Sequence, residues 1–149
     1  MPPVCLDASL VLLWFLRDPL SPRADALLDE WRLAATELIA PPMLRAEVPS
    51  VLRQAVYRGQ MNLEEGDEAL QVFLGAGIRI REPDGLLARA WDIGKTLNAP
   101  RLYDMYYLAL AEIEKCELWT ADRRFVNLVA PRSSVVKWVG DVPSETPGG

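Results

Sequence analysis

The feature that most constrains this 149-residue chain is a regular alternation of short apolar segments with longer helical segments. The strand signals lie at 3–6, 37–40, 77–81, 117–121 and 135–139. The helical signals lie at 10–16, 21–35, 43–58, 62–76, 84–97, 102–115 and 122–129. Strands that alternate with helices favour parallel pairing through right-handed crossovers. The sequence therefore predicts an α/β fold of three layers, α/β/α, around a mostly parallel sheet of about five strands.

No repeat and no linker divides the chain, so we expect a single domain over 1–142, followed by a flexible C-terminal tail over 143–149. The longest apolar runs, at 10–16 and 105–111, are far shorter than the roughly 18 residues that a membrane span needs. No secretory signal precedes them. A cytoplasmic location without membrane contact is the expectation.

Helix caps are expected at polar residues that precede the periodic segments. Ser9 is placed to cap the helix over 10–16, Asn62 the helix over 62–76, Asp84 the helix over 84–97, and Asp122 the short helix that follows it. The segment 77–81 alternates Ile and Arg, which is typical of a strand near a sheet edge or of one that is exposed on one face.

Histidine is absent, and only two cysteines, Cys5 and Cys116, are present. Ser–His–Asp triads, Cys–His nucleophiles and the usual zinc sites are therefore excluded. The net charge of −5 argues against a nucleic-acid partner. That argument weakens if four carboxylates are occupied by metal, because 16 basic side chains then face 17 acidic ones. We expect both cysteines to be reduced, buried thiols.

Two aspartates fall where an apolar strand ends and a helix begins. Ligands of parallel sheets bind at the carboxyl ends of the strands, so Asp7 and Asp122 are aimed at the same rim. Asp122 has an alternative role as a helix cap. Asp7 has no obvious structural task if Ser9 caps the next helix, and an unpaired buried carboxylate is costly.

Two further acids lie on apolar helical stripes. Glu47 falls between Leu44 and Val51 at helical spacing, and Asp104 aligns with Leu108 on a segment with hardly any polar face. Both are expected to face inward, although Asp104 is also well placed for the positive end of its helix. Four such acids repel one another and raise one another's pKa, and a divalent cation relieves that repulsion.

Four runs of the chain, in this order, resemble the PIN domain, particularly the bacterial and archaeal VapC-type toxin nucleases: VCLDAS at 4–9, PMLRAE at 42–47, YDMYYLALA at 103–111 and LWTADRRF at 118–125. The resemblance implies a metal-binding, catalytic quartet of Asp7, Glu47, Asp104 and Asp122, with Ser9 as an accessory contact. Some relatives carry a further acidic or amide residue just after the fourth motif, where this chain has Arg123 and Arg124. The number of bound ions therefore stays open.

The resemblance further implies a Mg²⁺- or Mn²⁺-dependent endoribonuclease, the toxin of a type II toxin–antitoxin pair. Its partners are an RNA substrate, a small antitoxin and a second copy of the chain. One alternative is a non-catalytic PIN-like module that binds a basic partner through its acidic pocket. Another is a phosphotransferase with an aspartyl nucleophile, for which no phosphate-binding loop is visible.

Other candidates have ordinary structural readings beside their functional ones. Arg123 and Arg124 are possible RNA contacts, or a solvated helix face. Tyr103, Tyr106 and Tyr107 can stack on bases, but aromatic side chains on such an apolar helix are more typical of a core. All five tryptophans are expected to pack in the interior: Trp14, Trp31, Trp91, Trp119 and Trp138.

Overall fold

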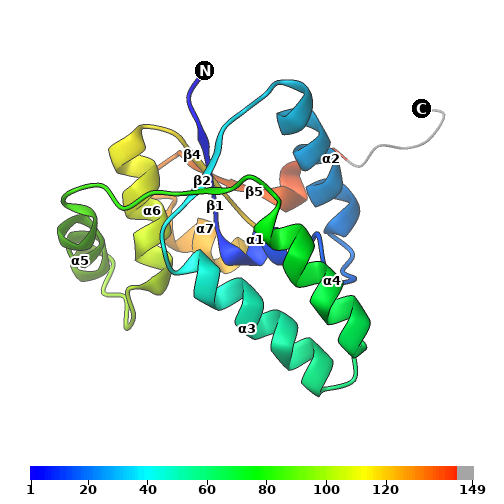
Figure 1. Cartoon of the computed structure of the whole chain (residues 1–149). Coiled ribbons are helices and arrows are strands. Elements are labelled where there is room, and N and C mark those ends of the chain that lie inside the picture. Colours follow the sequence, from blue (N-terminus) through cyan, green and yellow to red (C-terminus); the bar gives the residue numbers. More distant parts are fainter. Residues whose placement is uncertain (144–149) are drawn as a thin grey trace.

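The computed structural model describes residues 1–143, in which a five-stranded parallel sheet is covered by helices (Figure 1). Apart from Pro143, the tail expected over 143–149 lies outside the described residues. The elements follow in this order: β1 (Val4–Leu6), α1 (Ala8–Leu12), α2 (Ser21–Leu33), β2 (Leu38–Ala40), α3 (Leu44–Tyr57), α4 (Leu63–Leu74), β3 (Arg79–Ile80), α5 (Leu86–Thr96), α6 (Tyr103–Glu114), β4 (Glu117–Thr120), α7 (Arg123–Val129), β5 (Val136–Trp138) and the 3₁₀ turn η1 (Val139–Asp141).

The strand order across the sheet is β3-β2-β1-β4-β5, and every neighbouring pair is parallel. Val4 of β1 pairs with Leu38 of β2 on one side and with Glu117 of β4 on the other. The chain thus builds outward from β1 in one direction and then returns to build in the other. The strand order reverses between β1 and β4, which is where open α/β sheets place a ligand crevice, at the carboxyl ends of the strands.

Helices lie on both sides of the sheet, which confirms the predicted three-layer α/β/α class. In Figure 1, α5 and α6 lie to the left of the strands and α2 and α4 to the right, while α3 and α4 form a hairpin. The central strand β1 is buried along its whole length and is apolar throughout, as expected for a strand covered on both faces. Helix α6 packs against β1 and β4 and buries residues 105 and 107–111.

The predicted helix caps were partly wrong. Asn62 does cap α4, through a capping box with Glu65, and Asp122 does cap α7. The N-cap of α1, however, is Asp7, because the helix begins at Ala8 and only the residue before it reaches the first free N–H groups. The N-cap of α5 is Gly85 in a left-handed conformation, so Asp84 stands one residue too early. The edge strand β3 lies as predicted.

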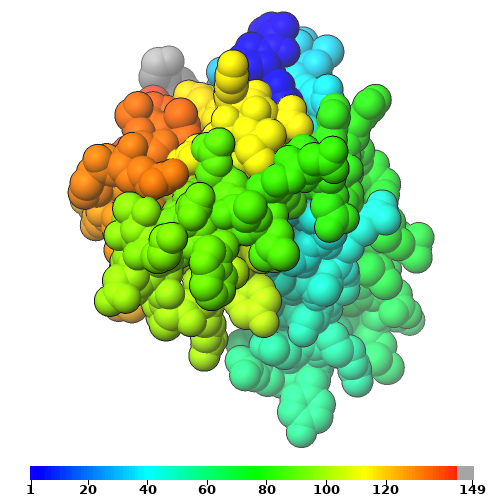
Figure 2. Space-filling view, turned by 90° about the vertical axis from the view of Figure 1, so that its left-hand side faces the viewer, coloured from blue at the N-terminus to red at the C-terminus, as the bar shows by residue number. Residues whose placement is uncertain are grey.

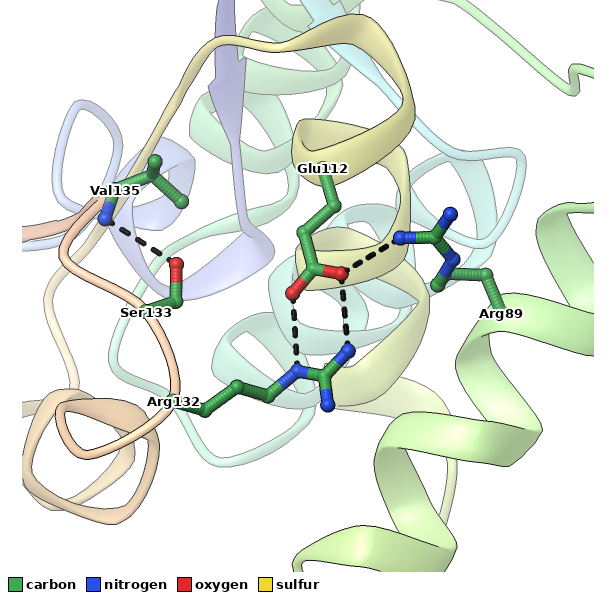
Figure 3. Close-up of polar contacts among 5 residues, drawn as sticks. All are labelled: Arg89, Glu112, Arg132, Ser133 and Val135. Atoms are coloured by element: carbon green, nitrogen blue, oxygen red, sulfur yellow. Dashed lines mark hydrogen bonds and ion pairs between the residues drawn. The ribbon is translucent and has the colours of Figure 1, made fainter.

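A cluster of charged side chains ties α5 and α6 to the segment after α7 (Figure 3). Glu112 of α6 accepts two hydrogen bonds from Arg132, both at 3.1 Å, and one from Arg89 of α5 at 3.0 Å. Burial, the largest single influence, raises the pKa of Glu112, but the two arginines together hold it below its ordinary value. The cluster fixes the outer helix α5 over α6.

The face formed by α5 is seen directly in Figure 2, where its side chains lie on top of α6. Trp91 of α5 is 60% exposed, which makes its predicted place in the interior wrong. The period of α5 buries Leu86, Ala90 and Ile93 instead, and this turns Trp91 outward. Cys5 and Cys116 are both free and buried, as predicted.

Candidate active site

A cavity of about 230 Å³ lies at the carboxyl ends of β1 and β4. Asp7 follows β1 directly, and Asp122 follows the end of β4 after one intervening residue. Glu47 reaches the cavity from the first turn of α3, and Asp104 from the first turn of α6. The structure therefore brings all four acids singled out from the sequence to one cavity. Its remaining lining is Ala8, Ser9, Leu12, Val51 and Tyr107.

Asp7 is the most deeply buried of the four acids, with 7% of its surface exposed. Its Oδ1 accepts hydrogen bonds from Ser9 Oγ at 2.7 Å and from the Leu10 N–H at 3.0 Å, and its Oδ2 accepts one from Thr120 Oγ1 at 2.5 Å. Burial raises the pKa of Asp7 to about 6, against the lowering effect of these bonds, and the charge of Asp104 raises it further. Burial, rather than mutual repulsion among the acids, is thus the main cause.

Two hydroxyl groups join Asp7 to the end of β4. Thr120, which is fully buried, accepts from the Asp122 N–H at 3.0 Å, while Ser9 accepts from the Ala121 N–H at 3.0 Å. The two hydroxyls lie 3.1 Å apart. Sequence reasoning missed Thr120, although its place as the last residue of a buried strand, two before an acid, is a usable signal. In this network Ser9 locks α1 to β4 rather than capping its own helix.

Glu47 is half-buried and accepts a hydrogen bond from the Tyr107 hydroxyl at 2.9 Å. Burial raises the pKa of Glu47, the bond from Tyr107 lowers it, and the charge of Asp104 raises it again. Burial also raises the pKa of Tyr107, with Glu47 adding to the effect, so the phenol stays protonated and remains the donor. Tyr107 lies one helical turn after Asp104, and this i, i+3 spacing is the signal that sequence reasoning left unused.

Asp104 and Asp122 line the same cavity but are exposed to solvent, so the expectation that Asp104 faces the interior was wrong. Asp104 is the second residue of α6 and lies ahead of the turns that cover the sheet. Partial burial raises its pKa, and the charge of Asp122 adds to this. Asp122 caps α7 by accepting from the N–H groups of Arg124 at 3.0 Å and Phe125 at 3.3 Å, both on Oδ1.

The donor set of the cavity suits a hard divalent cation. All four acids supply oxygen ligands, and within residues 1–143 none of them forms an ion pair with a Lys or Arg. As the side chains stand, no three Asp, Glu or Cys groups of the described residues are arranged to hold one ion. Both oxygens of Asp7 accept hydrogen bonds from hydroxyl groups, and one oxygen of Glu47 accepts a hydrogen bond from the phenol of Tyr107. The residues fit a metal in kind and in place, and their oxygens have to come closer together to bind one ion.

The two arginines after Asp122 differ in their surroundings. The guanidinium of Arg123 lies 4.7 Å from the ring centroid of Trp138, a cation–π contact, and the Trp138 indole N–H donates to the Ala121 carbonyl at 3.3 Å. Arg124 is exposed, and its side chain forms no hydrogen bond, ion pair or cation–π contact within residues 1–143. Arg123 is therefore held against the ring of Trp138, whereas no such contact holds Arg124.

A parallel sheet with four carboxylates gathered at its switch point defines an α/β domain with an acidic cavity in the usual ligand crevice of such sheets. Residues 4–130 match the family model for the PIN domain, and the chain belongs to this family. It is similar to the VapC ribonuclease Mb0985 of Mycobacterium bovis, with 36% identity over 92 residues, which covers 62% of this chain and 70% of the relative. Ribonuclease VapC9 of Mycobacterium tuberculosis matches with the same identity and coverage.

None of the helices within residues 1–143 combines the length and the apolar composition that a membrane span requires.

Proposed function

We propose that this chain is a metal-dependent endoribonuclease that hydrolyses RNA phosphodiesters, and that it is the toxin of a type II toxin–antitoxin pair. The observation that carries the proposal is the gathering of four carboxylates, without a cationic partner in residues 1–143, at one cavity of a PIN domain. The relatives' names, VapC ribonuclease and ribonuclease VapC9, support the choice of RNA.

The metal is Mg²⁺ or Mn²⁺ in this proposal. Asp7, Asp104 and Asp122 are its direct ligands, Glu47 binds it directly or through water, and Ser9 is an accessory contact. Such an ion supplies an activated water and neutralises charge that develops on the phosphate.

The chain's own residues set the geometry around these ligands. Thr120 and Ser9 hold the Asp7 carboxylate at the end of β1, and the Tyr107 hydroxyl holds Glu47 from the neighbouring helix. Arg123, which is fixed against Trp138, places a positive charge next to Asp122, where it attracts the phosphate backbone. Arg124, which is exposed, is a second RNA contact in this proposal.

The test is cleavage of a labelled RNA pool with Mg²⁺, with Mn²⁺ and with a chelator. Asp104→Asn is the informative variant, because the Asp104 carboxylate is exposed and forms no hydrogen bond or ion pair in residues 1–143. We expect cleavage that needs metal and falls at least a hundredfold in Asp104→Asn. Asp84→Asn, an exposed acid before α5, is the matched control and should cleave like the parent. Metal-independent cleavage, or equal cleavage by Asp104→Asn, contradicts the proposal. Metal and partner binding without any cleavage indicates the non-catalytic module instead.

The partners are part of the same proposal: an antitoxin whose arginine side chains enter the acidic cavity, and a second copy of this chain, both in the cytoplasm. Co-expression with the adjacent small gene should give a complex that resists separation at moderate salt. Light scattering of the isolated protein should give twice the mass of the chain. A monomer at high concentration contradicts the homodimer alone.

A further inference from the structure

A second cavity, of about 350 Å³, adjoins the acidic one. It shares Glu47 and Asp104 with the acidic cavity and is completed by Arg101 and Tyr103. Arg101 lies in the loop between α5 and α6, and Tyr103 is the first residue of α6. The lining of this cavity therefore combines two carboxylates with a guanidinium and a phenol ring.

Both added side chains are accessible. Tyr103 is 60% exposed, which corrects the expectation that it belongs to the core, whereas Tyr107 on the same helix is buried. Arg101 is exposed and makes no hydrogen bond or ion pair in the part of the chain that is described, in contrast to Arg81, Arg89 and Arg132, which each bind a glutamate. Arg101 thus keeps its full set of N–H donors for a ligand.

The pairing of these two groups has a specific chemistry. An exposed aromatic ring offers a face for an unpaired base, because every base has a π face, and a guanidinium binds a phosphate through two parallel hydrogen bonds. A single exposed tyrosine or arginine has no such meaning. Here the two share one cavity with two of the acids.

From this arrangement we infer that Arg101 and Tyr103 form a nucleotide subsite, which binds an unpaired nucleotide of the RNA next to the phosphate that the acids act on. The base stacks on the Tyr103 ring, and the neighbouring phosphate binds Arg101. The inference rests on the proposed function, since it takes RNA as the ligand. Duplex RNA does not fit, because its bases are already stacked on one another and cannot reach the ring.

Binding, rather than cleavage, is the measurement that tests the subsite. The probe is a fluorescent single-stranded RNA of random sequence, titrated with the protein in the presence of Ca²⁺, a hard cation that binds carboxylates and neutralises their charge, and followed by anisotropy. We expect Tyr103→Ala to raise the Kd roughly 5- to 150-fold, the range measured for loss of one stacked base, and Tyr103→Trp to keep the parent value. Arg101→Ala should weaken binding and reduce the slope of log Kd against log salt by about 0.7, the value of one phosphate contact on a single strand.

Tyr57 and Arg58 provide matched controls. Both are exposed, and Tyr57 lies ten residues after Glu47 along α3, roughly 15 Å away. Tyr57→Ala and Arg58→Ala should leave both the Kd and its salt slope unchanged.

The outcomes separate the subsite from the hydrolysis. RNA binding that depends on Tyr103 and Arg101 in a protein that does not cleave supports the subsite and defeats the proposed hydrolysis. Cleavage with Kd values that are the same in Tyr103→Ala and the parent overturns the subsite and leaves the hydrolysis standing. No binding of single strands by the parent, or equal binding of a duplex of the same length, also overturns the subsite.

Discussion

At the scale of single residues, the protons around Asp7 can be counted. The hydroxyls of Ser9 and Thr120 have one proton each, and both are donated to the ionised Asp7 carboxylate. No proton is then left between the two hydroxyl oxygens, which lie 3.1 Å apart without a hydrogen bond. When Asp7 takes up a proton on Oδ2, it donates to Thr120, and the Thr120 proton becomes free for Ser9. The network accepts the neutral form of Asp7 by rotation of the Thr120 hydroxyl, without movement of heavier atoms.

The first prediction follows from the raised pKa of Asp7. A carboxyl group with a higher pKa in the folded than in the unfolded chain stabilises the fold at low pH. This contribution is complete below about pH 4 and is lost as the pH rises through about 6. It amounts to about 3 kcal/mol, since each unit of pKa corresponds to about 1.4 kcal/mol. Without metal, Asp7→Asn should therefore be more stable than the parent at pH 7 and similar to it at pH 4.

Urea unfolding of the parent and Asp7→Asn at pH 4, 5, 6 and 7 measures this difference. The contributions of other titrating groups to the pH dependence of stability are the same in both proteins and cancel in the difference. One of these groups is Glu112, whose lowered pKa favours the fold at higher pH. A difference that stays constant with pH contradicts the assignment of the raised pKa to Asp7.

The second prediction concerns Thr120, which holds Asp7 Oδ2 and the Asp122 N–H at once. Thr120→Val keeps the shape but removes both bonds, so the free energy of unfolding should fall by about 1–3 kcal/mol. Loss of the bond to Asp7, a bond that lowers the pKa of Asp7, should raise that pKa further. The pH at which the stabilising contribution of Asp7 is lost should therefore move to a higher value. Thr120→Ser retains the hydroxyl and should keep the parent's pH profile. If Thr120→Val has that profile too, the hydroxyl does not act on Asp7.

At the scale of elements, a helix cap could be predicted from the sequence only where the pattern fixed the exact first residue of the helix. Asn62 fits because its partner Glu65 marks the register of the capping box. Ser9 and Asp84 were misplaced because a cap acts only from the position just before the helix, and no local signal distinguished Asp7 from Ser9 or Gly85 from Asp84.

These caps yield a matched third prediction. Asn62→Ala removes a side chain that accepts the Glu65 N–H at 2.8 Å and should cost about 1 kcal/mol of stability. Asp84→Ala removes a polar residue that caps no helix and should change stability by less than about 0.5 kcal/mol. Thermal melts of the two variants beside the parent decide the point, and equal losses would mean that Asp84 does cap α5 in solution.

At the scale of the whole molecule, the alternation of strands and helices was enough to predict a parallel three-layer fold, because parallel strands need crossovers. The strand order was not predictable, since it depends on contacts between distant segments. It is this order, with β1 beside β4, that brings Asp7 and Asp122 together. Helical spacing predicted only that Glu47 and Asp104 face inward, which was wrong for Asp104. That the two share a site with Asp7 and Asp122 was implied by the family resemblance and not by the spacing. Arg101 lies in a loop without periodicity, so only the fold shows that it borders the acids.

The fourth prediction tests the cavity as a metal site through the stability of the whole fold. An ion that binds the folded chain alone raises the free energy of unfolding, by about 2.7 kcal/mol at a hundredfold excess over its Kd. Added Mn²⁺ should therefore raise the Tm of the parent in a concentration-dependent way. Without metal, Asp104→Asn should start from a Tm at or slightly above that of the parent at pH 7, because the raised pKa of Asp104 shows that its charge is disfavoured in the fold. It should lose most of the metal-induced shift. Asp84→Asn should show the full shift. An equal rise in all three proteins would place the bound Mn²⁺ outside the cavity, because the loss of a carboxylate ligand must weaken any site to which it belongs.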